Sequence, residues 1–154
     1  MLNPRDIRFP CHTSCKGCPL MMRDRNLLLD EVHELRVKPK EGSCKLENVI
    51  YIAQCIECKD FYIGHSINML RTRCSGHRDD FKEGSYHKSA LSFHIYNDHH
   101  DKLEKGLKNF TFGVIAQCDP SSILDVENHY IILFNADNLH LNRYKASRAD
   151  VDNV

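Results

Sequence analysis

The sequence contains no long apolar run, and this absence argues against a membrane-spanning protein. Its longest apolar stretch is the short YIILF at 130–134, whereas about 20 apolar residues are needed to cross a bilayer as a helix. The N-terminal MLNPRDIRF also lacks the continuous apolar core of a secretory signal. We therefore expect a protein that acts neither in a membrane nor outside the cell.

Net charge is absent as well, because 21 Lys and Arg balance 21 Asp and Glu. This balance excludes a bulk electrostatic attraction to nucleic acid. Charge is less even locally: the segments 70–78 (LRTRCSGHR) and 142–148 (NRYKASR) each hold three Lys or Arg and no acidic residue. Patches of this size can contact a phosphate backbone, although a solvated surface of mixed charge is the commoner role.

What the sequence has in excess is cysteine and histidine, with 8 and 10 residues among 154. A chain of this length fits one compact domain with a small appendage. An even number of cysteines is compatible with disulfides, but those belong to secreted proteins, and in a reducing compartment clustered cysteine and histidine indicate zinc. The clusters are Cys11, Cys15 and Cys18, then Cys55 and Cys58, and then His94, His99 and His100.

Cys55 and Cys58 form a Cys-x-x-Cys at a predicted turn between strands, which is the usual geometry of a zinc half-site. The alternatives, a redox pair or two small buried thiols, fit less well because a redox pair sits between a strand and a helix. His94 with His99 or His100 has the spacing of the second half-site, and we place His100 ahead of His99. The distance in sequence from Cys58 to His94 predicts a zinc staple within the domain rather than a base-reading finger.

Residues 1–45 are punctuated by proline and glycine and carry too few apolar groups to fold unaided. We expect a small zinc knuckle followed by an arm, with metal binding supplying the missing stability. Leucines at helical spacing predict a short helix or a loose arm over 21–35. Cys11, Cys15, Cys18 and Cys44 would complete a second tetrahedral site, with His12 as a substitute for one of them. Cys74 and Cys118 lack partners and are predicted to be packed thiols.

From residue 46 onward the pattern predicts an α+β domain that extends to 148, followed by a tail at 149–154. The element order is β-β-α-α-β-α, which implies a small three-stranded antiparallel sheet flanked by helices. The predicted strands cover 48–55, 60–65 and 110–118, and the predicted helices cover 67–82, 87–100 and 119–136. Asp119 is expected to cap the last helix and Pro120 to begin it.

The first two strands are rich in tyrosine. Strand alternation places Tyr51 on one face with Val49 and Ala53, and Tyr62 can lie beside it across the hairpin. Gly64 then lets the backbone leave the sheet or lets a bulky group approach closely. Taken alone, the two tyrosines are more often half-buried sheet aromatics than functional residues.

Three further polar residues fall at positions that join them to this hairpin. Arg73 and His77 are four residues apart and share a helical face. Glu127 interrupts the apolar face of the last helix, where a carboxylate is costly unless paired or metal-bound. Two phenols, an arginine, a histidine and a carboxylate suit phosphodiester hydrolysis. The plainer alternatives are a surface arginine, like Arg71, and a core histidine.

These patterns resemble the signatures of the GIY-YIG nucleases. VIY at 49–51 matches the first signature and YIG at 62–64 the second, with ten residues between the tyrosines. The arginine helix of the family resembles LRTRCSGH, its glutamate helix resembles LDVENHYI, and its late asparagine resembles the one in LHLNRY. YHKSALSFH resembles the sequence around a further active-site histidine of some members. Val49 in place of the first glycine and the spacing of Leu124 from Glu127 are departures.

Within this family the sequence is most similar to the endonuclease domains of Penelope-like retroelements, which also place two cysteines between the signatures and a histidine pair later. The resemblance covers 11–145, nearly the whole chain. It implies a nuclear, metal-dependent endonuclease that nicks duplex DNA for target-primed insertion, with a reverse transcriptase domain of the same element as partner. It also implies one or two structural Zn²⁺ ions.

The resemblance assigns roles residue by residue. Tyr51 would take a proton from the attacking water, directly or through His77, while Tyr62 orients that network. Arg73 would stabilise charge on the phosphate, Glu127 would hold Mg²⁺ or Mn²⁺, and a late asparagine would position Glu127 or the substrate. Two alternatives are a structure-specific nuclease of branched DNA and a catalytically silent zinc-stabilised nucleic-acid binder. The implied catalytic residues are Tyr51, Tyr62, Arg73, His77, His87, Glu127 and Asn142.

Overall fold

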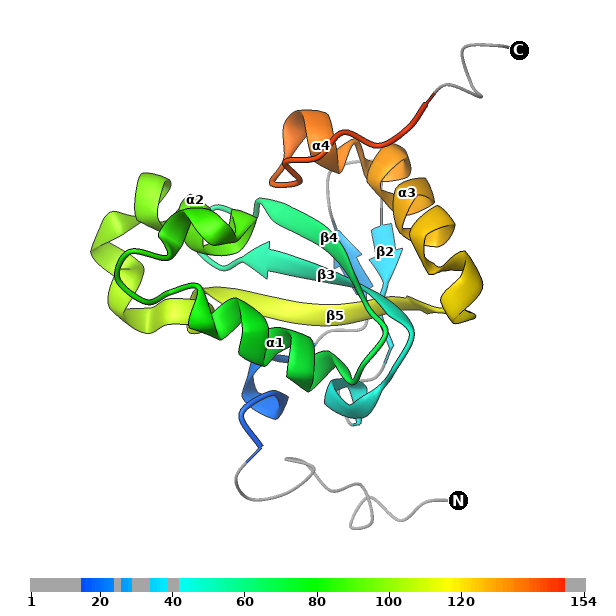
Figure 1. The fold of residues 1–154 in the computed structure, drawn as a ribbon, viewed down its shortest axis with the longest axis horizontal. Coiled ribbons are helices and arrows are strands. Elements are labelled where there is room, and N and C mark those ends of the chain that lie inside the picture. The colour runs from blue at the N-terminus through cyan, green and yellow to red at the C-terminus, as the bar shows by residue number, and fades with distance from the viewer. Residues whose placement is uncertain (1–14, 24–25, 29–33, 39–41, 149–154) are drawn as a thin grey trace.

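Three strands form the sheet at the centre of the structure, a computed structural model that describes residues 15–23, 26–28, 34–38 and 42–148. The central strand β3 pairs antiparallel with β4 on one side and with β5 on the other (Figure 1). The prediction of a mixed helix-and-strand fold around a small three-stranded antiparallel sheet is therefore confirmed. The strands are β3 (Val49–Cys55), β4 (Phe61–Ser66) and β5 (Phe110–Gln117).

α-Helices and short 3-10 helices connect and flank these strands. The helix predicted over 119–136 is divided: a 3-10 turn with Pro120 at its start comes first, and Asp119 makes no side-chain cap. The helix that follows ends at Asn135, which adopts a left-handed φ of 54°. The α-helices are α1 (Leu70–Asp79), α2 (Ala90–Asp98), α3 (Ile123–Phe134) and α4 (Ala136–Leu139). The 3-10 helices are η1 (Cys18–Leu20), η2 (Ser43–Lys45), η3 (Tyr86–Lys88), η4 (His100–Asn109) and η5 (Pro120–Ser122).

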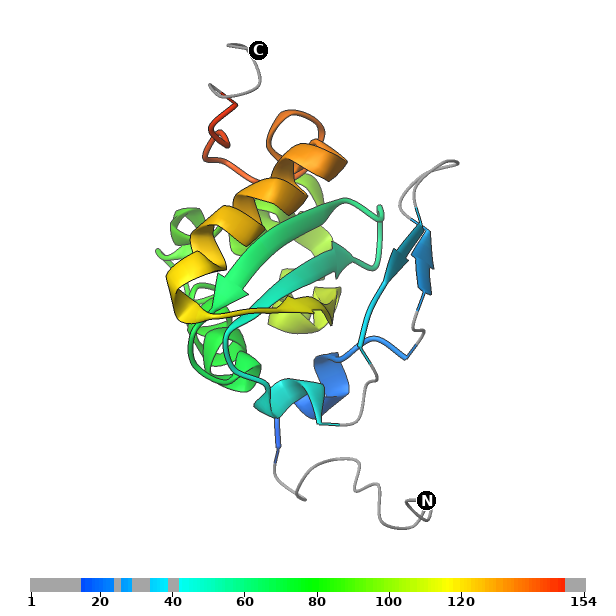
Figure 2. The same cartoon turned by 90° about the vertical axis from the view of Figure 1, so that its right-hand side faces the viewer.

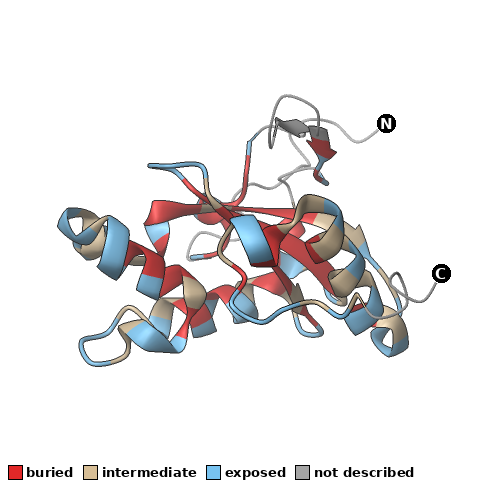
Figure 3. Ribbon diagram, turned by 90° about the horizontal axis from the view of Figure 1, so that it is seen from above, coloured by how far each residue is buried: buried red, intermediate tan, exposed pale blue. Residues whose placement is uncertain are grey.

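The sheet separates two apolar cores, because neighbouring side chains of a strand point to opposite faces. Val49, Tyr51 and Ala53 face a core shared with α1 and α2. Ile50 and Ile52 face a second core that α3 and α4 complete. All seven residues of β3 are buried, and Figure 3 shows buried residues along the strands with exposed ones on the outer surfaces of the helices.

The N-terminal segment contains a strand pair where a short helix or a loose arm was predicted. β1 (Asn26–Leu28) and β2 (Glu34–Arg36) pair antiparallel and lie beside the main sheet in Figure 2. Burial follows a period of two, because Leu35 and Val37 are buried while Arg36 and Lys38 are exposed. The leucine spacing mimics a helical face, but packing of alternate side chains into the second core selects a strand.

The same segment covers the edge of β5. The backbone N–H of Met22 donates to the carbonyl of Phe112 over 2.7 Å, and that of Lys38 donates to the carbonyl of Val114 over 2.8 Å. Gly113 permits this approach, because a Cβ there would lie only 2.8 Å from Val37 Cγ1. The segment therefore satisfies edge groups that would otherwise be open to pairing with another chain.

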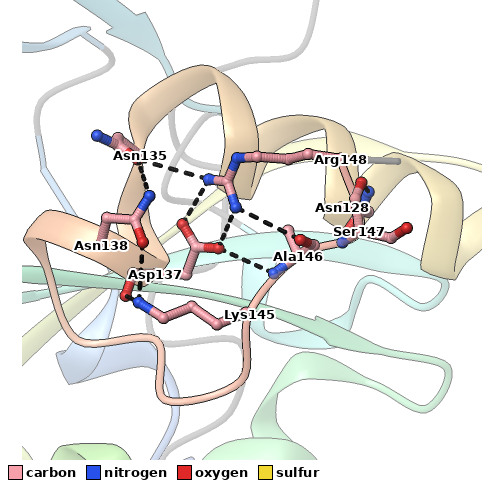
Figure 4. A network of polar contacts seen from close by, with 8 residues as sticks. All are labelled: Asn128, Asn135, Asp137, Asn138, Lys145, Ala146, Ser147 and Arg148. Atoms are coloured by element: carbon pink, nitrogen blue, oxygen red, sulfur yellow. Dashed lines mark hydrogen bonds and ion pairs between the residues drawn. The ribbon is translucent and has the colours of Figure 1, made fainter. Parts of the chain in front are cut away.

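A buried carboxylate fastens the C-terminal segment to α4. Asp137 has no exposed side-chain surface, and both of its oxygens accept hydrogen bonds from Arg148, over 2.6 and 2.7 Å (Figure 4). Its Oδ2 also accepts from the backbone N–H of Ala146. Hydrogen bonds from Arg148, which outweigh the opposing effect of burial, hold the pKa of Asp137 far below its usual range. Such charge-assisted bidentate pairs are the strong hydrogen bonds of proteins.

The other cations of the basic segment at 142–148 also make hydrogen bonds within the chain. Lys145 donates from Nζ to the carbonyl of Asp137 over 2.7 Å and to Oδ1 of Asn138 over 2.8 Å. Arg143 donates to the carbonyl of His87 over 2.9 Å. The cations that we expected to face a phosphate backbone thus make contacts within the chain.

Replacing Asp137 with Asn should lower the free energy of unfolding by about 2–4 kcal/mol at pH 7, because the charge that holds Arg148 is lost. Since the folded-state pKa of Asp137 is depressed, its stabilisation is present above the pKa of the unfolded carboxyl group, about 3.9, and is lost as the pH falls below it. The difference between the two proteins in urea unfolding should therefore shrink from pH 5 to pH 3.

The control for this measurement is Asp79→Asn. Asp79 pairs with Lys82 at 3.5 Å, and both side chains are mostly exposed, so this variant should change stability by no more than about 0.5 kcal/mol. Equal losses in the two variants, or a difference that does not depend on pH, would contradict the assigned role of Asp137.

Candidate active-site cleft and metal centres

A cleft of about 520 Å³ opens beside the edge strand β4, between the start of α1 and the middle of α3. The two faces of the sheet meet at an edge strand, so side chains from both faces can line one cleft. Tyr62 points to the α1 face and His65 to the α3 face. Arg73 of α1 and Glu127 of α3 also line the cleft, together with Tyr144.

Glu127 is paired within this cleft. Its Oε2 lies 2.6 Å from Nδ1 of His65, which explains how a carboxylate is tolerated on the inner face of α3. The hydrogen bond to Glu127 raises the pKa of His65, although burial opposes the shift. His65 is not among the site residues predicted from the sequence. Its signal is the position after Gly64, where strand alternation turns the side chain to the face covered by the glutamate helix.

Behind the cleft, Tyr51 is joined to His77. The phenol oxygen of Tyr51 lies 2.7 Å from Nε2 of His77, and Nδ1 of His77 lies 3.2 Å from Oγ of Ser89, the residue that caps α2. Burial, with the nearby charge of Arg73, lowers the pKa of His77 to about 3. His77 is therefore neutral at pH 7 and can accept a hydrogen bond from the phenol. Tyr51 itself has 0% exposure, and burial raises its pKa.

Arg73, and not Arg71, is the arginine of α1 that faces this cleft. Its guanidinium lies close enough to Tyr51 and Tyr62 for their phenols to raise its pKa, against the lowering by burial. Arg71 lines a separate depression with Lys16 and Arg78. The register that favours Arg73 in the sequence is the one that the helix adopts.

Gly64 is needed where the hairpin and the cleft meet. It lies opposite Tyr51 in the β3–β4 register, and a Cβ at this position would lie 2.5 Å from the Tyr51 phenol oxygen and 2.7 Å from the Tyr62 ring. The rings of Tyr51 and Tyr62 have centroids 6.2 Å apart. Tyr51 occupies the space that any larger residue at position 64 would fill.

Two of the predicted site residues lie elsewhere. Asn142 does not contact Glu127; its side-chain amide pairs with the backbone of Ile63, over 2.9 Å to the N–H and 2.8 Å to the carbonyl. It extends the edge of β4 much as an added strand residue would. His87 is exposed on η3 and lines a different pocket, because the turn before α2 directs it away from the cleft.

Four residues at the β3–β4 turn and α2 could hold a metal such as zinc. Ligand atoms of Cys55, Cys58, His94 and His99 all lie within 4.8 Å of one another. Sγ of Cys58 lies 3.3 Å from Nε2 of His94, while Nδ1 of His94 pairs with Asp98 at 3.0 Å. A carboxylate behind a ligating histidine is the usual way to fix its tautomer.

His99 carries the sharpest sign of a ligand, because its Nε2 is buried and has no hydrogen-bond partner. The preference for His100 was wrong: Nδ1 of His100 lies 3.0 Å from the carbonyl of Tyr96, one turn earlier, and the residue is exposed. Burial raises the pKa of the Cys55 thiol, but hydrogen bonds from His94 and from neighbouring backbone N–H groups outweigh it and lower the pKa. The donor set, two thiols and two imidazoles, is that of a structural zinc site.

The N-terminal cysteines form a second group. Sγ of Cys44 lies 3.4 Å from Sγ of Cys18 and 3.9 Å from Sγ of Cys15, and the three could hold a metal. Cys11 and its substitute His12 lie outside the described residues. Cys74 is fully buried, and burial raises its pKa to about 12, as expected for a packed thiol. Cys118 is partly buried against the second core.

No protein-family model, curated protein or solved structure matches this chain in the three comparisons. Within the residues that the structure describes, no helix has the length and apolar character to cross a membrane. The functional interpretation therefore depends on the geometry of the cleft and the two cysteine groups.

Protein purified without chelator should contain zinc by elemental analysis, and His99→Ala should lose about one equivalent of it. His100→Ala is the matched control, since the neighbouring imidazole lies outside the group, and it should retain the metal of the parent protein. Loss of zinc from the His100 variant alone would contradict this ligand assignment.

Gly64→Ala should lower the free energy of unfolding by about 1–3 kcal/mol, because the added methyl displaces the buried ring of Tyr51. The control is Gly76→Ala within α1, where a Cβ meets no atom closer than 3.6 Å and alanine should stabilise the helix by about 0.5–1 kcal/mol. Thermal unfolding of both variants tests the sign of each effect. A neutral Gly64 variant would mean that Tyr51 does not occupy this space.

Proposed function

We propose that this protein is a metal-dependent DNA endonuclease that hydrolyses a phosphodiester bond. The observation that carries the proposal is the cleft beside β4, where Tyr62, Arg73 and Glu127 come together from three elements, with the Tyr51–His77 pair behind them. These are the phenol, cation, carboxylate and imidazole that the sequence motifs select. Each type has a defined use at a phosphate that is attacked by water.

Glu127 would hold Mg²⁺ or Mn²⁺ at the cleft. The residue fits this use, because its carboxylate faces the cleft and Mg²⁺ commonly takes one or two protein carboxylates together with substrate phosphates. When bound, the ion would supply charge neutralisation at the phosphate and at the leaving oxygen. His65, which pairs with the same carboxylate, would orient it toward the cleft.

Arg73 would stabilise the negative charge that develops on the phosphate, since its guanidinium lines the cleft and cannot lose its proton. Tyr62 would orient the attacking water. As the new oxygen–phosphorus bond forms, Tyr51 would take the water proton while its own phenol proton passes to Nε2 of neutral His77. His77 would then release that proton to solvent, and the departing oxygen would take a proton from solvent. Because Tyr51 lies behind Tyr62 and Arg73, the proton would pass between these side chains.

The zinc groups would be structural in this proposal. The Cys55 group joins the β3–β4 turn to α2, and so holds the helix whose cap contacts His77. The resemblance to Penelope-like retroelements suggests a biological setting: nicking of duplex DNA in the nucleus to prime insertion, beside a reverse transcriptase domain. That setting is supported by the sequence motifs alone.

The first test is nicking of supercoiled plasmid with Mg²⁺ or Mn²⁺ added. Glu127→Gln should abolish nicking, and Arg73→Ala should reduce its rate by about 10²–10³-fold, the usual loss for a group that stabilises transition-state charge. Arg71→Ala is the matched control on the same helix, and its rate at saturating DNA should be within about threefold of the parent.

Native protein that cuts neither plasmid, branched DNA nor RNA would refute the proposal, and binding of DNA without cleavage would point to a nucleic-acid-binding module. Faster cutting of branched DNA than of plasmid would keep the chemistry and assign the protein to structure-specific nucleases. Nicking that survives in both Glu127→Gln and Arg73→Ala would show that the activity does not come from this cleft.

A further inference from the structure

A second pocket, of about 570 Å³, lies against α2, and no role in the proposed reaction uses it. It is formed where η3, α2 and η4 come together, at the end of the molecule that carries α2 in Figure 1. Most of its lining is aromatic or imidazole. The residues that matter here are Glu83, Tyr86, His87, Phe93, Tyr96 and His100.

The aromatic side chains of this pocket form a built platform. The rings of Tyr86 and Tyr96 stack with centroids 4.9 Å apart and planes inclined by 17°, and His100 lies edge-on to Tyr96 at 5.1 Å. Phe93 and Tyr96 are 41% and 42% exposed. Rings held in place at a concave surface and still open to solvent are a feature of binding sites rather than of scattered surface residues.

The pocket connects to the cleft through two neighbouring residues. Arg143 donates a hydrogen bond to the carbonyl of His87 at the pocket, and the next residue, Tyr144, lines the cleft and is 91% exposed. A nucleic-acid strand that leaves the cleft past Tyr144 would therefore pass Arg143, which is bonded to the backbone of His87 at the pocket. Arg143 and the exposed Lys88 supply positive charge on the way.

We propose that the second pocket binds an unpaired nucleobase of the DNA held in the cleft. This proposal rests on the proposed function. The exposed faces of Phe93 and Tyr96 can stack on any base, and this form of recognition tolerates changes of sequence. Glu83 offers a carboxylate that can accept from an exocyclic amino group of a base. A substrate with a single-stranded extension next to the cleavage site would therefore bind better than a blunt duplex.

The test is binding without added divalent ion, by fluorescence anisotropy, of a labelled duplex with a short single-stranded extension and of the same duplex with blunt ends. Tyr96→Ala should weaken binding of the extended DNA by about 5- to 100-fold, the range for loss of one base stack. Binding of the blunt duplex should change by no more than about twofold. Tyr96→Phe keeps the ring and should restore binding, and Leu133→Ala, an exposed apolar residue of α3, is the control.

The chain contains no tryptophan, so Tyr96→Trp places a single fluorescent indole in the pocket. Its emission should be quenched by the extended DNA and not by the blunt duplex. Tyr96→Ala that weakens binding of both DNAs equally, or that leaves the affinity for the extended DNA unchanged, would overturn the inference. Proline-rich peptides also bind aromatic-lined grooves, so quenching of the Trp fluorescence by such a peptide but not by DNA would overturn it too.

These outcomes separate the two proposals. Selective binding of the extended DNA by a protein that never cleaves would keep the base pocket and refute the nuclease. Cleavage that depends on Glu127, combined with Tyr96 variants that bind extended and blunt DNA equally well, would keep the nuclease and refute the base pocket. Unfolding temperatures of the Ala, Phe and Trp variants within a few degrees of the parent confirm that each comparison is made on folded protein.

Discussion

The packing of the Tyr51 ring over Gly64 is the contact on which the rest of the site depends. It sets how closely the second tyrosine strand can approach the first, and it directs the phenol toward α1. There the phenol meets His77, which in turn contacts the cap of α2 through Ser89. A single buried side chain thus relates the sheet to two helices. The zinc-type group at the β3–β4 turn links the same strand and α2 at their other ends, so that the two connections brace one another.

The parts of this arrangement that the sequence predicts are those governed by a regular period. Alternation along β3 is enough to place Tyr51 and Ile50 on opposite faces, and the helical period is enough to align Arg73 with His77. A small antiparallel sheet also follows from the turn signals. The pairing of His65 with Glu127 could not be derived in this way, because it depends on how far α3 lies from the strand edge. The two residues are far apart in sequence, so neither the strand period nor the helical period relates them.

Other errors come from tertiary choices between nearly equal local options. The leucines at 27, 28 and 35 suit a helix, but Asn26–Leu28 and Glu34–Arg36 form a strand pair, and Leu35 packs in the second core. His99 and His100 both have allowed spacing from His94, and only the end of α2 decides which imidazole turns inward. Asn142 lies in the predicted motif, yet its amide serves the backbone of β4. Edge strands need such partners, and each edge of this sheet has them along part of its length: the N-terminal segment at β5 and this amide at β4.

The segment 143–145, which carries Tyr144 into the cleft, is fixed at both of its ends. Asn142 is held to β4, and Ala146 and Arg148 are held to Asp137, so that only residues 143–145 run between the anchors. From Asn142 to Ala146 the chain takes four Cα-to-Cα steps, which span at most about 14 Å when extended. The Tyr144 side chain is therefore exposed while its backbone is held in place. The backbone entropy of ordering this residue is lost during folding and not on binding. The two anchors therefore fix where Tyr144 stands at the cleft, and inserting one residue between them would shift that aromatic ring while the strand and helices that form the cleft stay in place.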